Sequence, residues 1–152
     1  MRVSSFIPVK RIAALVAIVC LAACEKKSGT WTNDPKNWER AFGEKKENGV
    51  VVQNSWYWRS PHFALEYEFF FTLSAWEPYR KKALDALKDG ILIDVSGPGG
   101  LPKFFNHKPK WFVPKGREKY QILQGKSENA NEHFYLFIDR ETGELHYTNY
   151  SV

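Results

Sequence analysis

The chain has 152 residues and a formal net charge of +5, from 22 Lys and Arg residues against 17 Asp and Glu residues. Three of the basic residues, Arg2, Lys10 and Arg11, precede an uncharged run at 12–23, so removal of this leader would leave 19 basic residues against 17 acidic ones. A nucleic-acid-binding domain usually carries a strong basic excess on one face. The nearly balanced remainder therefore argues against nucleic acid as a partner.

The leader has the order of parts of an export signal. Its basic residues come first, no acidic residue is among them, and the uncharged run of twelve residues follows. Because a helix needs roughly 20 apolar residues to span a bilayer, this run suits a transient export segment better than a permanent span. We predict a cleaved signal peptide at 1–23.

The run ends in Leu21-Ala22-Ala23-Cys24, which resembles the lipobox of bacterial lipoproteins in all four positions. The resemblance implies cleavage before Cys24, a diacylglyceryl group on its sulfur and a further acyl chain on the new amino terminus. Several chains matter because a single acyl chain gives only marginal, reversible membrane binding. Residues 24–32 would then form a lipidated tether. In the lipoprotein family Glu25, in place of aspartate, favours the outer membrane, with the domain facing the periplasm.

Cysteine chemistry is also limited by this leader. Cys20 would leave with the signal peptide and Cys24 would be acylated. The mature protein would have no free thiol, disulfide or thiolate metal ligand. Its stability would depend on packing alone.

The remaining residues, 33–152, have the size of one domain that can bury its own core. Aromatic residues make up 16% of the chain, so large rings must fill this core or cover a binding face. The first predicted element is a short helix, 34–42, with Asp34 as N-cap and Gly43 as its stop. Trp38 and Phe42 share one face of it.

Two runs, 50–59 and 62–73, alternate between apolar and polar residues and predict an antiparallel strand pair. The apolar face of the second run carries Phe63, Leu65, Tyr67, Phe69, Phe71 and Leu73. The other face carries Glu66, Glu68, Thr72 and, as an exception, Phe70. We expect the first face to be covered and the second to be partly wet.

A second helix is predicted at 76–88, packed on the apolar face of the sheet. The later elements are a strand at 91–95, a long loop at 96–114, a strand at 120–124 and a hairpin of 133–139 with 144–150. Strands dominate, with two helices. The predicted class is α+β, with a single antiparallel sheet of about five strands packed against one or two helices.

Motifs for catalysis or metal binding are weak. Pairing Asp139 with Glu144 in the hairpin would place His146 opposite Phe137 and His133 opposite Tyr150, which separates the two imidazoles by roughly 13 Å. No His-x-His or His-Glu-x-x-His spacing occurs, and the glycine-rich stretch 96–100 lacks the Gly-Lys-Ser/Thr ending of a phosphate loop. We expect no metal, no cofactor and no enzymatic activity.

Two segments combine aromatic and basic residues, 56–62 and 103–112. Trp, Tyr and Arg dominate protein interfaces, and cationic side chains beside exposed rings also suit a membrane surface. The alternative is that these rings close the core beneath a loop. The candidate partner-binding residues are Trp56, Tyr57, Trp58, Arg59, His62, Lys103, Phe104, Phe105, His107, Lys108, Lys110 and Trp111.

These features favour a lipid-anchored envelope protein that binds another protein, such as an inhibitor or immunity factor against an envelope-targeted toxin. Its size and lipobox resemble those of small periplasmic immunity lipoproteins, a likeness of architecture without a shared motif. A structural or assembly lipoprotein of an envelope or secretion machine is one alternative. A small hydrolase or ligand carrier with an unrecognised site is another.

Overall fold

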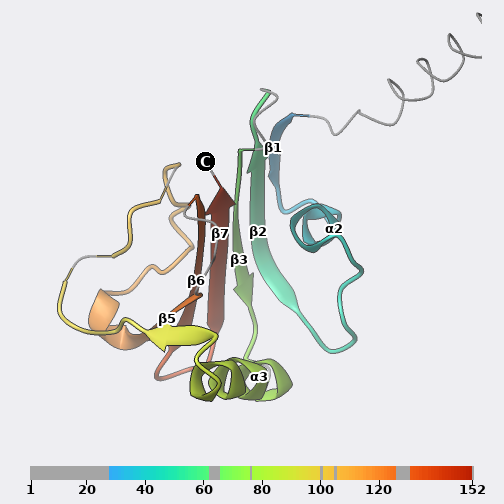
Figure 1. Ribbon diagram of the computed structural model, residues 1–152. Coiled ribbons are helices and arrows are strands. Elements are labelled where there is room, and N and C mark those ends of the chain that lie inside the picture. Colours follow the sequence, from blue (N-terminus) through green and yellow to red (C-terminus); the bar gives the residue numbers. More distant parts are fainter. Residues whose placement is uncertain are drawn as a thin grey trace, which may run out of the picture.

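The computed structural model describes residues 28–61, 66–75, 77–99, 101–104, 106–125 and 131–151. Within these residues the chain forms one open antiparallel sheet of seven strands and two α-helices (Figure 1). The strands are β1 (Gly29–Thr32), β2 (Val52–Arg59), β3 (Tyr67–Leu73), β4 (Leu92–Asp94), β5 (Tyr120–Gly125), β6 (Glu132–Asp139) and β7 (Leu145–Ser151). The helices are α2 (Asn37–Phe42) and α3 (Glu77–Lys88), with a short 3-10 helix η1 (Arg117–Lys119).

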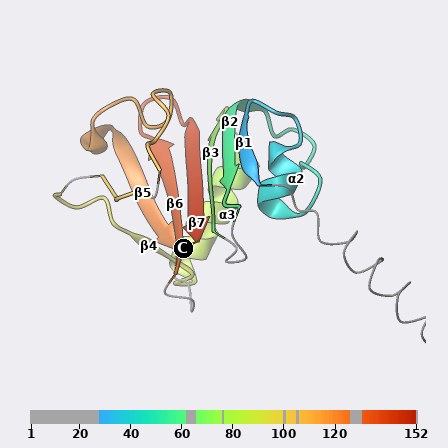
Figure 2. The ribbon, with the colours of Figure 1, turned by 90° about the horizontal axis from the view of Figure 1, so that it is seen from above.

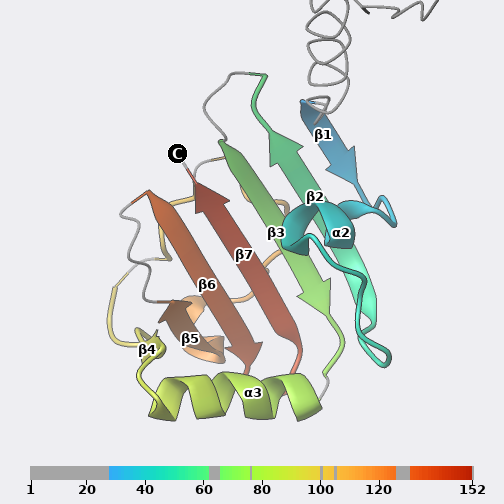
Figure 3. The ribbon, with the colours of Figure 1, turned by 45° about the vertical axis from the view of Figure 1, so that its right-hand side comes forward.

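The strand order is β1-β2-β3-β7-β6-β5-β4, and every neighbouring pair is antiparallel. The first three strands form one half of the sheet. Helix α3 then lies across the strand ends and carries the chain to β4 at the far edge (Figure 3). The chain returns strand by strand to β7, which pairs with β3 and joins the two halves.

The sequence-based prediction of an α+β fold is confirmed at the level of a mostly antiparallel sheet with two helices. The predicted number of about five strands is wrong, because the sheet has seven. One reason is β1, which lies in the segment assigned to the tether. Its sequence, Gly29-Thr30-Trp31-Thr32, is small and polar except for Trp31, whose ring packs 5.9 Å from that of Tyr57.

One face of the sheet carries the larger hydrophobic core, and the helices cover parts of it. Figure 2 shows α2 on one side of the curved sheet. Trp38 of α2 and Ala83 of α3 belong to the same buried cluster as Phe69 and Phe71 of β3. The predicted contact of α3 with this core is confirmed, but the helix lies across the strand ends and does not cover the face of the sheet (Figure 3). No helix in the described part of the chain has the length and apolar character needed to cross a membrane.

The opposite face carries a second core, and the prediction that this face is partly wet is wrong around β3. Residues 95–116, here called the strap, cross this face between β4 and η1; Gly100 and Phe105 of the strap lie outside the described residues. Glu68 is 0% exposed and Thr72 is 2% exposed. Alternation separates polar from apolar side chains, but it does not reveal that a distant loop covers the polar side.

Of the two residues predicted to end α2, Gly43 is confirmed and Asp34 is not. Gly43 ends the helix in a left-handed conformation, with φ of 71°, and its N–H donates to the Glu39 carbonyl at 2.9 Å. Asp34 is not the N-cap, because α2 begins at Asn37. The Asp34 carboxylate instead accepts the N–H of Lys36 at 2.8 Å and caps the turn before the helix.

Asp139 fixes the hairpin between β6 and β7. Its Oδ1 accepts the backbone N–H groups of Glu141 and Thr142 at 2.9 and 3.0 Å, and its Oδ2 lies 2.7 Å from the Lys115 ammonium. Burial acts to raise the pKa of Asp139, but the hydrogen bonds from Lys115 and from these N–H groups outweigh it and lower the pKa to about 2. Because Lys115 belongs to the strap, this carboxylate joins the hairpin to the strap.

Replacement of Asp139 by Asn should lower the free energy of unfolding by about 2 kcal/mol at pH 7, because a charge-assisted hydrogen bond and two turn hydrogen bonds are weakened. Since the folded pKa lies below 3.8, the stabilisation is present above that pH and is lost as pH falls toward 2. Urea unfolding measures both effects. Glu141→Gln, at an exposed side chain near the same lysine, is the control and should change stability by less than about 0.5 kcal/mol; an equal loss in both variants would contradict this role.

Candidate functional site

The strap is anchored by its own aromatic residues in the second core. Phe112 is 0% exposed, and its ring lies 4.8 Å from that of Phe70 and 5.7 Å from that of Phe137. Val113 is buried beside it. The centre of the strap is therefore part of the packed interior.

Basic side chains hold the strap in shape. Lys108 donates to two consecutive strap carbonyls at 2.7 and 3.3 Å, and burial lowers the pKa of its ammonium. Arg117 donates to the carbonyl of Gly97 at 3.1 Å, and Lys115 pairs with Asp139. These three cations therefore brace the protein's own chain.

Polar side chains of the sheet also hold the strap backbone. The buried Glu68 carboxylate accepts the N–H of Asn106 at 2.6 Å, and the Tyr150 hydroxyl donates to the carbonyl of Lys103 at 3.1 Å. Glu68 therefore has a structural role in this arrangement. Glu66 and Glu68, two residues apart in the sequence, are therefore not a pair of exposed carboxylates that could act together in catalysis, because Glu68 is buried.

His146 connects β7, β3 and the strap beneath Phe112. Its Nδ1 lies 3.1 Å from the Thr72 hydroxyl and 3.4 Å from the backbone nitrogen of Val113, which donates its N–H. Nδ1 is therefore an acceptor, and the neutral ring carries its proton on Nε2. Nε2 lies 3.2 Å from a carboxylate oxygen of Glu144, although not in hydrogen-bond geometry. Burial lowers the pKa of His146 to about 4, against the opposing effect of the Asp139 charge.

Alternation along β2 divides the first aromatic segment between the two faces of the sheet. Trp56 lies on the strap side and packs against the second core, whereas Tyr57 points to the helix side and is 5% exposed in the first core. By the same alternation Trp58 lies with Trp56 and Arg59 with Tyr57. The four candidate residues of this strand are thus divided between two faces.

The two aromatic and basic segments both contact the ring of Phe70 in β3. Trp56 lies 5.5 Å and Phe104 lies 5.6 Å from Phe70, measured between ring centroids. Trp111 also packs against this second core and remains partly exposed. Segments separated by more than 40 residues in the sequence therefore form one surface.

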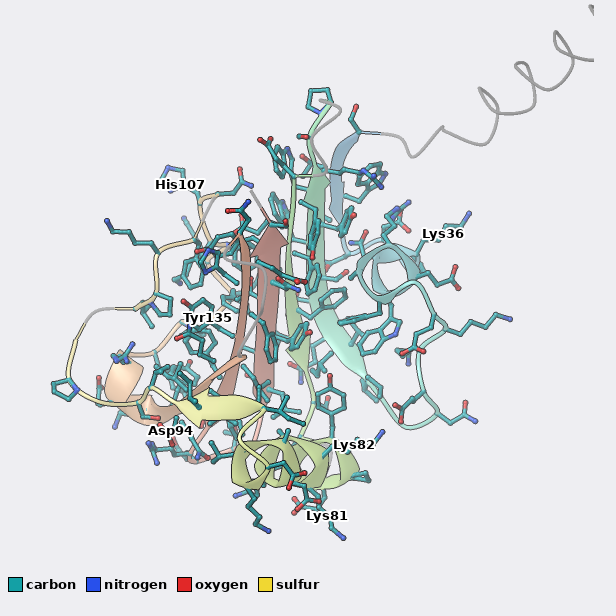
Figure 4. The ribbon with its side chains drawn as sticks, viewed as in Figure 1. Lys36, Lys81, Lys82, Asp94, His107 and Tyr135 are labelled. Atoms are coloured by element: carbon teal, nitrogen blue, oxygen red, sulfur yellow. The ribbon has the colours of Figure 1, made fainter. Side chains whose placement is uncertain are left out.

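The outer side of this surface is basic. Lys103, His107 and Lys110 are exposed, and their side chains form no ion pair within the described residues. Figure 4 shows His107 pointing away from the sheet, while Tyr135 points from β6 toward the strap side. The candidate residues His62 and Phe105 lie outside the described residues.

The predicted register of the hairpin histidines is confirmed. His146 pairs with Phe137, and His133 pairs with Tyr150. The His133 ring stacks on that of Tyr150 at 4.6 Å, far from His146. Among the described residues, no three His, Cys, Asp or Glu side chains are grouped so that they could hold a metal ion.

Sequence inspection missed the bracing roles of Lys115 and Arg117. A signal for them is present: from 95 to 117 the chain contains five Lys and Arg residues and no acidic residue. A segment with one sign of charge indicates that some of its cations pair with acids elsewhere in the fold. Lys115 does so with Asp139, whereas Arg117 donates to a backbone carbonyl, which the charge pattern does not predict.

No protein-family model, no curated protein and no solved structure matches this chain.

The stability of the strap-covered core should fall in acid because of His146. Its folded pKa of about 4 lies below the usual 6.5, so the unfolded chain binds a proton that the fold excludes, and stability is lost as pH falls from 6.5 toward 4. Between pH 7 and pH 5 this residue should contribute a loss of about 2 kcal/mol. Urea unfolding of His146→Gln, which has no titrating ring, should show a correspondingly weaker pH dependence.

The matched control is His133→Gln, because His133 is partly exposed and lies on the same hairpin. It should keep the pH dependence of the parent protein. If His146→Gln and the parent lose the same free energy between pH 7 and pH 5, the proposed role of His146 in acid sensitivity is wrong.

Proposed function

We propose that the protein is an envelope lipoprotein that binds another protein through the strap face, defined as the surface of Trp56, Trp58, Lys103, Phe104, His107, Lys110 and Trp111. The observation that carries the proposal is the convergence of the two aromatic and basic segments on Phe70. Partly exposed rings with exposed cations around them match the composition of binding hot spots. His62 and Phe105 remain predicted members of this surface from the sequence.

The fixed shape of the strap supports a binding role. Its centre is buried in the second core and held by Lys108, while Arg117 binds the carbonyl of Gly97 near its start and Lys115 binds Asp139 near its end. A loop that is already ordered loses little conformational entropy when a partner binds. The strap thus differs from a segment that would have to fold on its target.

The chemistry of the partner follows from the charge. Lys103 and Lys110 are exposed, and the strap itself contains no acidic residue. An acidic patch on the partner would complement this surface, and such complementarity raises the association rate and excludes partners of the wrong charge. A toxin that acts in the envelope and presents acidic residues near its active surface is the kind of partner that we propose, with this protein as its inhibitor.

Charge reversal should test the strap face. We expect Lys103→Glu with Lys110→Glu to weaken the complex with the partner at least tenfold, a loss of about 1.4 kcal/mol. The control is Lys45→Glu with Lys81→Glu, which makes the same charge change at exposed lysines away from the strap; Figure 4 shows Lys81 on α3.

The measurement starts from the soluble domain that follows Cys24, used to capture its partner from an envelope extract by crosslinking, and continues with titration of the purified partner. Salt should weaken the parent complex by screening the attraction, but it should not weaken the complex of the strap variant in this way, because the reversed charges repel an acidic partner and salt screens that repulsion. Equal affinity of the strap and control variants would show that the partner binds elsewhere.

Lipidation should require Cys24. The parent protein should incorporate labelled palmitate and remain in the membrane fraction after a high-salt wash, whereas Cys24→Ala should do neither, since several acyl chains are needed for stable anchoring. Cys20→Ala, which changes the other cysteine within the proposed signal peptide, is the matched control and should behave as the parent does. Membrane retention and labelling of Cys24→Ala would contradict the lipid anchor.

A further inference from the structure

A cavity of about 330 Å³ lies on the other side of the molecule, between α2 and the start of β2. The segment that follows β1 forms one wall, and Trp38 and Glu39 of α2 form another. Val52 of β2 and Phe71 of β3 contribute apolar surface. This volume is at the lower end of the range of small-molecule sites.

Trp38 provides an observation that points to a ligand. The residue is 8% exposed, and its ring packs 4.4 Å from Phe42 and 5.7 Å from Phe71. Its indole N–H is buried and has no acceptor among the described residues. Buried donors without an acceptor are rare in folded proteins, and a ligand oxygen in the cavity could supply the missing acceptor.

The charged residues around the cavity are mostly engaged with the protein. Asp34 pairs with Arg40 at 3.1 Å, and the Lys46 ammonium donates to the carbonyl of Val50. Glu39 is exposed and forms no ion pair with the described residues. The wall therefore offers no unengaged cation for an anionic ligand.

Two polar side chains in the wall offer a donor and an acceptor to a ligand. Asn33 uses its Oδ1 to accept the N–H of Ser55 at 2.8 Å, so its amide N–H groups can donate to a ligand. The exposed Glu39 carboxylate can accept. Asn54 also lines the cavity, but it pairs with Thr72 of β3, so its side chain lies on the strap side of the sheet. A purely apolar ligand would remove Asn33 and Glu39 from water without replacing their hydrogen bonds, which is unfavourable.

We propose that this cavity binds a small uncharged saccharide. A sugar ring has an apolar face of C–H groups, which matches Val52 and Phe71, and hydroxyls that both donate and accept. Those hydroxyls match the amide of Asn33 and the Glu39 carboxylate, and one ring or acetamido oxygen would accept the Trp38 N–H. The site lies on the opposite side of the sheet from the strap face, so the proposal does not rest on the proposed protein partner.

The test is a titration of the ¹⁵N-labelled soluble domain with N-acetylglucosamine and with glucose, followed by NMR. The indole N–H signal of Trp38 is assigned by its absence in Trp38→Phe. We expect this signal and the backbone signals of Asn33 and Asn54 to shift in a saturable way with at least one sugar at concentrations up to about 10 mM, ten times a Kd of about 1 mM.

Two variants test whether the sugar binds in this cavity. Glu39→Ala, which removes an exposed carboxylate from the cavity wall, should weaken binding about tenfold while the remaining spectrum shows an intact fold. Tyr79→Phe is the control, because Tyr79 lines a neighbouring, more apolar cavity between α2 and α3 that also has Trp38 in its wall. It should bind the sugar as the parent does.

Saturable shifts at the lining residues that are weakened by Glu39→Ala support the proposal. Three results overturn it: no shift with either sugar, shifts centred on Tyr79 and lost in Tyr79→Phe, or shifts produced by an uncharged dipeptide amide but by neither sugar. Because the readout concerns the cavity alone, failure of the strap-face experiment would leave this result unchanged.

Discussion

The pairing of β3 with β7 is the constraint on which the rest of the structure depends. These strands pair from Tyr67 with Ser151 to Leu73 with Leu145, across most of the length of the domain sequence. The pairing joins two halves of the sheet that are each built from neighbouring strands. Contacts between residues so distant in sequence are slow to form, so we infer that the two halves gain their shared cores only when β7, the last strand, is in place.

β3 contributes to both cores because its aromatic residues are consecutive. Phe69 and Phe71 lie in the core under the helices, and Phe70 between them lies in the core under the strap. All three are 1% exposed or less. A strand with one wet face would not need Phe70 to be aromatic. The exception in the sequence pattern was therefore the sign of a second covered face.

Much of the sheet could be predicted because local patterns determine it. Alternation identifies β2 and β3, and the turn after Asp139 sets the register that places His146 opposite Phe137. The burial of Glu68 could not be predicted in this way, because it depends on Asn106, 38 residues later in the sequence. β1 was missed for a related reason: its few residues are ordered by pairing with β2, and their composition alone does not predict a strand.

The strap and the cavity beside α2 also differ in how far the sequence predicts them. Composition identifies the strap as aromatic and basic, but it does not show that Phe112 and Val113 enter the core while Lys103 and Lys110 stay outside. That division follows from strap anchors located on three different strands. The cavity beside α2 is less predictable still, because its walls come from four separate parts of the chain and no single segment carries a motif.

The register of the sheet also determines how the two sites would be presented at a membrane. Gly29 pairs with Arg59, Arg59 with Tyr67 and Tyr67 with Ser151, so the start of β1 lies at one end of the sheet, and α3 lies across the other end (Figure 3). With Cys24 acylated as proposed, the five residues from Cys24 to Ser28 reach at most about 18 Å. The end with Gly29 would then lie nearest the membrane. The strap and the cavity lie on opposite sides of the sheet, and neither is confined to the end that carries Gly29. In the proposed orientation, both would therefore remain accessible from the periplasm.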